Sequence, residues 1–169
     1  MNYNTISRSR FNEINEYISI RITIPNLYLK AQKRDVRGFY EDLVKIIIYV
    51  RDLPIVTIPN PFFPSFKVAL RDINAIKNHN KVKKKNSPPE IIFQRLNLSI
   101  CHWVENNYDT QLLHFKIAFP LLKELKDVGA TKFQIILQQE ILKSFASGSF
   151  QVKEFLKKEG YLNLISDFF

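Results

Sequence analysis

Residues 17–25 read YISIRITIP, and this stretch indicates most directly that the chain contains β-structure. Its four isoleucines alternate with Ser19, Arg21 and Thr23, and a period of two with β-branched residues is typical of a half-buried strand. Pro25 has no backbone N–H and ends the pattern. The pattern predicts one strand, with an apolar face toward a core and a polar face toward water.

The segments that flank this strand follow other patterns. Residues 1–16 are polar and rich in Asn, Ser and Arg, so we expect a flexible arm or a marginal first helix there. After the strand, Asp35 can cap a helix over residues 36–52, because apolar residues recur at the spacing of one helix face. These residues are Val36, Phe39, Tyr40, Leu43, Ile47 and Val50.

Prolines dominate residues 53–64, where four of them remove backbone donors and favour extended conformations. We expect a short edge strand over residues 55–58, followed by a turn or a polyproline II segment over residues 60–64. Residues 65–80 begin with alternating apolar positions and finish at helical spacing. This mixture predicts an extended segment that runs into a helix.

A well-marked helix start follows at Ser87, Pro88 and Glu90. Serine at the cap, proline at the first helical position and glutamate at the third form a capping box. We expect the helix that follows to bury its apolar residues, which are Ile92, Phe93, Leu96, Ile100, Trp103 and Val104.

Caps and glycines divide the rest of the chain into further helices. Asp109 can cap a segment that runs to Val128, interrupted at Pro120. Gly129 fits the left-handed position that commonly ends a helix.

A second capping box, at Thr131 and Gln134, opens a helix that Gly148 closes. Ser149 can cap the next helix, which Gly160 ends.

These patterns predict an α+β fold that is predominantly helical. We expect a flexible arm over residues 1–16 and a basic α+β part over residues 17–86, with one or two strands and one long helix. This part packs on a helical interaction module over residues 87–169. A single compact domain is the alternative, since 169 residues suit one domain or two small ones.

Composition excludes several classes of protein. Cys101 is the one cysteine, which excludes an internal disulfide framework and favours a reducing compartment. The first residues lack the apolar region of a secretory signal, and no apolar run approaches the about 18 residues that a membrane span needs. We therefore expect an intracellular protein, cytoplasmic or nuclear, without a membrane partner.

The positive charge is concentrated in one part of the chain. Residues 1–100 contain 17 Lys and Arg against 8 Asp and Glu, whereas residues 101–169 contain 8 of each. An anionic partner is therefore expected to contact the first part. Two clusters are the candidate anion-binding residues, namely Lys30, Lys33, Arg34 and Arg37, and Lys77, Lys81, Lys83, Lys84 and Lys85.

Four phenylalanines stand where a small domain has difficulty burying every apolar group. They are Phe62 and Phe63, between prolines, and Phe168 and Phe169 at the end of the chain. Exposed aromatic residues anchor protein interfaces, so these four are the candidate contacts for a protein partner. The alternative is that each folds back onto the core.

The histidines and the cysteine indicate no catalytic or metal site. His79, His102 and His114 lack a second His or Cys at the spacing of a zinc site. Cys101 and His102 are adjacent, so on a helix they point about 100° apart and suit neither a shared metal nor a nucleophile and its base.

Acidic pairs are the remaining candidates for metal-dependent chemistry. Glu41 with Asp42, or Glu13 with Glu16, could hold a divalent cation, although solvation or ion pairing is the ordinary role of such residues. The four glycines are scattered, so no phosphate-binding loop is formed. We expect no cofactor and no catalytic residue.

Two segments resemble known families. Phe155, Gly160, Tyr161 and Ile165 belong to a stretch, residues 149–165, that resembles the helix–glycine–helix junction of armadillo-type repeats. This resemblance implies an armadillo-like interaction module without catalytic residues.

Residues 39–103 resemble the N-terminal helical domain of transcription elongation factor S-II. The likeness lies in a helix that ends at Leu53 and Pro54, a later stretch with Ile73 and Ile76, and a last helix that reaches Trp103. It implies a module that binds short motifs of protein partners.

These observations predict a non-catalytic macromolecule-binding or scaffolding protein. Its basic half is expected to contact nucleic acid or a ribonucleoprotein, and its helical half to contact protein. One alternative is a metal-dependent nuclease or phosphotransfer enzyme that uses the acidic pairs. Another is a protein–protein adaptor whose basic charge is incidental.

Overall fold

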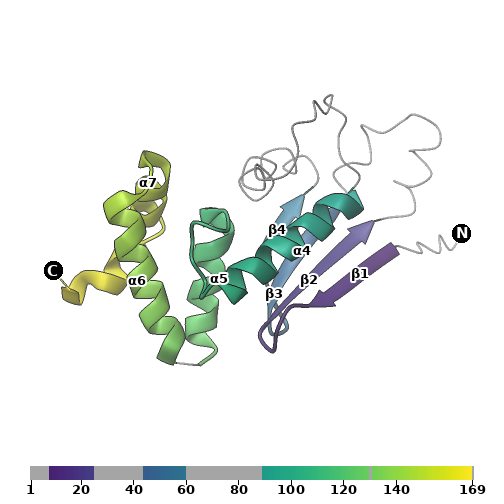
Figure 1. Ribbon diagram of the computed structural model, residues 1–169, viewed down its shortest axis with the longest axis horizontal. Coiled ribbons are helices and arrows are strands. Elements are labelled where there is room, and N and C mark those ends of the chain that lie inside the picture. The colour runs from purple at the N-terminus through teal and green to yellow at the C-terminus, as the bar shows by residue number, and fades with distance from the viewer. Residues whose placement is uncertain (1–7, 25–43, 60–88, 130, 169) are drawn as a thin grey trace, which may run out of the picture. The chain divides into compact units, whose positions relative to one another are not determined.

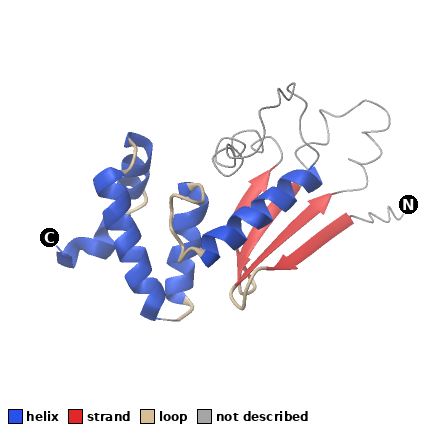
Figure 2. Cartoon of the chain, in the orientation of Figure 1, coloured by secondary structure: helices blue, strands red, loops and turns tan. Residues whose placement is uncertain are grey.

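The computed structural model describes residues 8–24, 44–59, 89–129 and 131–168. The chain divides into two compact units, Met1–Cys101 and His102–Phe169. Strands occur in the first unit and helices dominate the second (Figure 2). The fold class is α+β, as the sequence predicts.

A four-stranded antiparallel sheet forms the centre of the first unit (Figure 1). Its strands are β1 (Arg8–Glu13), β2 (Ile18–Ile24), β3 (Lys45–Val50) and β4 (Leu53–Pro59), and they lie in the sheet in chain order. The predicted strand is β2, and the predicted edge strand is β4. At the turn before β2, the side chain of Asn15 accepts hydrogen bonds from the backbone N–H groups of Tyr17 and Ile18.

On one face of this sheet, the side chains of β2 and β3 are apolar and buried. The register aligns Ile20 with Ile48 and Ile22 with Ile46, so the branched side chains of β2 and β3 are direct neighbours. Burial of one such side chain stabilises the fold by about 1.5–3 kcal/mol. The strand residues of this face that are at most 2% exposed are Ile18, Ile20, Ile22, Ile24, Ile46, Ile48, Val50 and Ile58.

Helix α4 (Pro89–Glu105) lies along this apolar face (Figure 1). Asn12, which β1 places on the apolar side opposite Ile20, donates a hydrogen bond from Nδ2 to Oδ1 of Asn97 at 2.7 Å. As predicted, α4 buries Phe93 and Ile100 among its apolar residues. Because the helix packs on the sheet, the division between the units falls within it, whereas we expected a boundary before residue 87.

Two expectations for the N-terminal part are wrong. The helix predicted over residues 36–52 is replaced at Lys45–Val50 by β3, because three consecutive isoleucines suit a strand and buried positions there alternate. Ile47, assigned to the helix core, is half-exposed. Residues 8–13 of the expected flexible arm form β1. The sheet therefore has four strands instead of one or two.

The second unit consists of α5 (Phe115–Asp127), α6 (Thr131–Ser147), α7 (Phe150–Lys158) and the 3₁₀ helix η4 (Tyr161–Phe168). Gly129 and Gly160 have φ angles of +115° and +74° and end their helices as predicted. The junction at Gly160 thus joins α7 to a 3₁₀ helix. Elsewhere in this unit, the Tyr108 ring meets the rings of Trp103 and Phe133 edge to face, with centroid distances of 5.0 and 5.1 Å respectively.

The helix predicted to start after Asp109 begins later, at Phe115, with His114 as its N-cap. Asp109 instead accepts a hydrogen bond from the backbone N–H of Gln111. Pro120 does not interrupt α5. The proline removes the hydrogen bond that its own N–H would donate to the carbonyl of Lys116. Lys116 lies in the first turn of α5 and is exposed, so water can satisfy this carbonyl.

The two faces of β3 predict a sharp difference between neighbouring substitutions. Ile48→Ala should lower the free energy of unfolding by about 3 kcal/mol, because it leaves a cavity under α4. Ile47→Ala should cost less than about 1 kcal/mol, because the side chain is half-exposed. Both variants replace an isoleucine of the same strand by alanine, so they lose the same β-propensity. The difference between their free energies of unfolding, measured by urea denaturation and circular dichroism, therefore reports the effect of burial. Equal losses would contradict the one-sided core.

Candidate nucleic-acid interface

Most of the side chains expected to bind partners lie outside the described residues. This holds for both basic clusters, at residues 30–37 and 77–85, and for Phe62, Phe63 and Phe169. Phe168 belongs to η4, but its side chain is not described. A candidate site must therefore be built from the sheet and helices themselves.

The side of the sheet that faces away from α4 is the candidate, and we call it the open face. We use row for residues that are paired with one another across neighbouring strands. The central row crosses all four strands and consists of Phe11, Arg21, Ile47 and Thr57. The flanking rows hold Ser9, Thr23 and Lys45 on one side, and Glu13, Ser19 and Tyr49 on the other.

Arg21 is the centre of the open face. Its guanidinium carbon lies over the Phe11 ring at 5.4 Å from the centroid and over the Tyr49 ring at 5.5 Å. The two rings come from the strands on either side of β2, so the cation lies between aromatic groups. Phe11 is 50% exposed and Arg21 is also exposed. Cation–π contacts of this kind contribute about 0.5–1 kcal/mol at exposed sites.

A second aromatic–cation pair lies at the β3–β4 turn. The guanidinium carbon of Arg51 is 5.8 Å from the centroid of the Tyr17 ring. Arg51 has a φ of +53°, which is uncommon outside glycine. Its backbone N–H donates to the carbonyl of Tyr17 at 2.6 Å, and this bond connects the turn to the residue that precedes β2.

The open face carries a gradient of charge along its strands. Lys45 is exposed at one end, in the row with Ser9 and Thr23. Glu13 lies at the other end and is the one carboxylate among the described strand residues of this face. Planar aromatic rings, a planar guanidinium and an ammonium group can stack on flat groups and neutralise phosphates, but they supply no nucleophile or general base.

Sequence reasoning missed this constellation for identifiable reasons. It assigned Arg21 to the polar face of its strand, but it placed Phe11 in a flexible arm and Tyr49 in a helix. The alternation of Arg21 and Thr23 was the available indication of an open face.

The histidines and acids of the described residues form no group that could hold a metal ion. His102 is exposed and its ring Nδ1 lies 3.1 Å from the side-chain amide of Asn106. Glu13 and Glu16 are exposed, whereas His79, Glu41 and Asp42 lie outside the described residues. Within residues 8–24, 44–59, 89–129 and 131–168, no three His, Cys, Asp or Glu side chains lie close enough to hold a metal ion.

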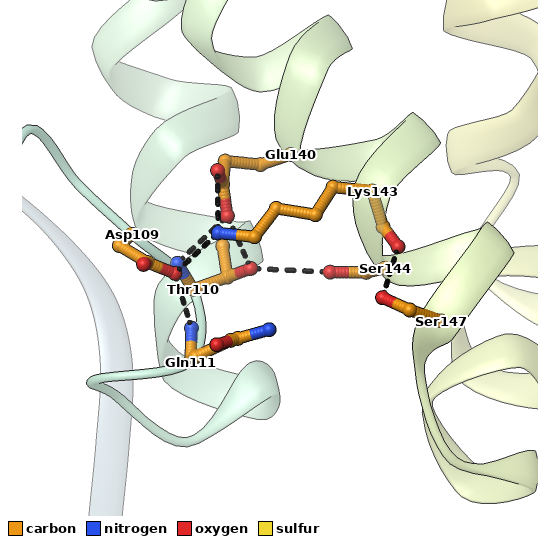
Figure 3. A network of polar contacts seen from close by, with 7 residues as sticks. All are labelled: Asp109, Thr110, Gln111, Glu140, Lys143, Ser144 and Ser147. Carbon is orange, nitrogen blue, oxygen red and sulfur yellow. Dashed lines mark hydrogen bonds and ion pairs between the residues drawn. The ribbon is translucent and has the colours of Figure 1, made fainter.

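The most extensive polar network of the second unit has a structural role (Figure 3). The buried carboxylate of Glu140, on α6, accepts hydrogen bonds from the backbone N–H and the hydroxyl of Thr110, at 2.8 and 2.6 Å. The Thr110 hydroxyl also lies 3.1 Å from that of Ser144. These contacts attach the loop before α5 to α6.

Lys143 completes this network and forms ion pairs with both of its carboxylates. Its ammonium group lies 2.8 Å from Asp109 and 3.5 Å from Glu140. Burial alone would raise the pKa of Asp109, but hydrogen bonds from Lys143 and from the backbone of Gln111 hold that pKa below its ordinary 3.8. The hydrogen bond to Asp109 raises the pKa of Lys143. The charges of this network are therefore paired with one another.

Removal of the Glu140 carboxylate should destabilise the second unit. Glu140→Ala leaves the buried N–H of Thr110 without its acceptor, and we expect a loss of about 2 kcal/mol in the free energy of unfolding. Gln139→Ala, at an exposed neighbouring position of α6, should change it by less than about 0.5 kcal/mol. Urea unfolding followed by Trp103 fluorescence measures both. Equal stabilities of the two variants would contradict the network's role.

His114 should make stability depend on pH. Its Nδ1 accepts the backbone N–H of Lys116 at 3.3 Å, which requires the neutral ring. Burial, reinforced by the Lys116 charge, lowers the pKa of His114 below its ordinary 6.5. The unfolded chain therefore takes up this proton first as pH falls. The stabilisation is complete above pH 6.5 and is lost as pH falls through the lowered pKa.

The matched variant is His114→Asn, because asparagine also caps helices but does not titrate. The fall in unfolding free energy between about pH 7.5 and about pH 5 should be smaller in this variant than in the unmodified chain. The same pH dependence in both proteins would exclude His114 as its source.

Comparisons of the chain with protein families, with curated proteins and with solved structures found no match. The two resemblances noted in the sequence therefore stay hypotheses. For the second of them, β3 occupies a part of the chain where the likeness implies a helix. None of the described helices combines the length and the apolar character that a membrane crossing requires.

Proposed function

We propose that this protein is a non-catalytic nucleic-acid-binding protein whose first unit contacts the phosphate backbone. The observation that supports this most strongly is the match between charge and architecture. The first unit ends at Cys101, and all of the formal net charge of +9 belongs to residues 1–101. Residues 102–169 are neutral overall.

Some described cations of the second unit are paired with acidic side chains. Lys143 and Lys157 form ion pairs, and Lys123 and Lys132 lie over aromatic rings. In the first unit, Arg21 and Lys45 are exposed on the open face, and Arg21 contacts aromatic rings. Exposed positive charges attract a polyanion, and each phosphate that they neutralise releases counterions. Binding should therefore tolerate many sequences and weaken as salt is raised.

A protein partner for the second unit stays a prediction. This unit exposes Phe150 to 77% and Ile135 to 51%. Single apolar side chains of this kind are common on protein surfaces. The proposal is therefore confined to the basic unit, and binding to a ribonucleoprotein would follow from its affinity for the nucleic acid.

A mobility-shift titration with two charge-matched variants tests the proposal. One variant replaces the predicted phosphate contacts Lys77, Lys81, Lys83, Lys84 and Lys85 by serine. The control replaces five exposed lysines of the second unit by serine, namely Lys116, Lys123, Lys132, Lys157 and Lys158. Both variants lose the same formal charge, so net charge alone cannot separate them.

We expect the unmodified chain to bind oligonucleotides at about 50 mM salt and to lose affinity steeply as salt rises. The first variant should bind at least about tenfold more weakly and with a smaller salt slope, whereas the control should stay within about twofold. No binding at low salt would refute the proposal. Equal losses in the two variants would favour an adaptor with incidental charge.

A further inference from the structure

The open face offers three flat groups side by side on adjacent strands. Phe11 on β1 and Tyr49 on β3 flank Arg21 on β2, within 5.4 and 5.5 Å of the guanidinium carbon. Phe11 and Arg21 are exposed and Tyr49 is half-exposed. Aromatic rings and guanidinium planes are the side-chain groups on which unpaired bases stack.

The opposite face of the sheet could not serve in this way. Its isoleucine and valine side chains on β2 and β3 are buried, and α4 lies along them, as the hydrogen bond between Asn12 and Asn97 shows. The chain therefore has one aromatic and cationic sheet surface among its described residues, and this surface lies in the basic unit.

We propose that the open face binds single-stranded RNA, with bases stacked on Phe11 and Tyr49 next to Arg21 and with the backbone near Lys45. This inference rests on the proposed function and names its substrate class. A duplex hides the faces of its bases in its own stack, so these rings can engage bases only where the strand is unpaired. Lys45 supplies positive charge in the row on one side of Phe11 and Arg21. Glu13 shares the row of Tyr49 on the other side, and its carboxylate disfavours phosphate there.

Hydroxyl side chains on the same face favour RNA over DNA. Ser9 and Thr57 are exposed and Thr23 is half-exposed, and the register places them beside the central row or within it. A ribose 2′-hydroxyl can donate to and accept from such groups, and this group distinguishes RNA from DNA.

The test uses the full chain and four labelled probes of equal length in fluorescence anisotropy titrations. The probes are a single-stranded RNA, the same RNA annealed to its complement, the same sequence as DNA, and an abasic strand that keeps the phosphates. We expect the single-stranded RNA to bind at least about tenfold more tightly than the duplex and the abasic strand at equal salt.

Substitutions then locate the contact. Phe11→Ala and Tyr49→Ala should each weaken binding of single-stranded RNA by about 5- to 100-fold, without a change in salt slope. Tyr49→Phe keeps the ring and should retain affinity. Lys45→Gln should reduce the slope of log affinity against log salt concentration by about the amount that one phosphate contact contributes. Phe150→Ala is the matched control, because it removes an exposed phenylalanine from the second unit.

The outcomes separate this inference from the proposed function. Salt-dependent binding in which duplex, abasic strand and single strand are equal would uphold the proposed function and overturn the stacking surface. Equal affinity for the DNA and RNA single strands would overturn the assignment to RNA. No binding to any probe at about 50 mM salt would refute both.

Photo-crosslinking keeps the inference testable if an alanine variant fails to fold. RNA that contains 4-thiouridine should crosslink, in the unmodified chain, to peptides that contain Phe11 or Tyr49. Crosslinks confined to peptides of residues 102–169 would overturn the assignment of the open face.

Discussion

In an antiparallel sheet successive side chains point to opposite faces, and β2 and β3 carry isoleucine or valine at every second position. The register brings these residues opposite one another, as with Ile20 and Ile48, so one face becomes continuous apolar surface. Such an apolar surface must be shielded from water, and α4 lies along it (Figure 1). The other face is left with the polar and aromatic side chains that define the candidate site. The one-sided core and the open face therefore have the same cause.

Charged side chains have different surroundings in the two units, and this difference is consistent with the proposal that the first unit binds the anionic partner. In the second unit a buried carboxylate, Glu140, receives two hydrogen bonds from Thr110, and Lys143 forms ion pairs with Glu140 and with Asp109. Charges that are paired in this way orient a loop and are less available to a ligand. In the first unit Arg21 contacts the rings of Phe11 and Tyr49 and is exposed to solvent, so its charge is accessible to a ligand.

Secondary structure was predicted correctly where a segment contains the whole signal within its own residues. β2 was predicted from strict alternation, and α4 from its cap and helical spacing. Local patterns failed for β3, because Ile46, Ile47 and Ile48 are apolar on both sides of the strand and fit a helix stripe equally well. They failed for β1 because its buried side carries polar residues such as Asn12, whose amide is satisfied by Asn97 on a helix far along the chain.

From its amino acids alone, the chain shows an α+β composition of segments, a basic first part and a neutral helical second part, because alternation, caps and charge are local properties. Folding in three dimensions placed Phe11 and Tyr49 on either side of Arg21, and placed Thr110 on Glu140. These groups come from segments that no short-range pattern connects. Strand register and helix packing bring them together because the burial of apolar faces selects one pairing among many.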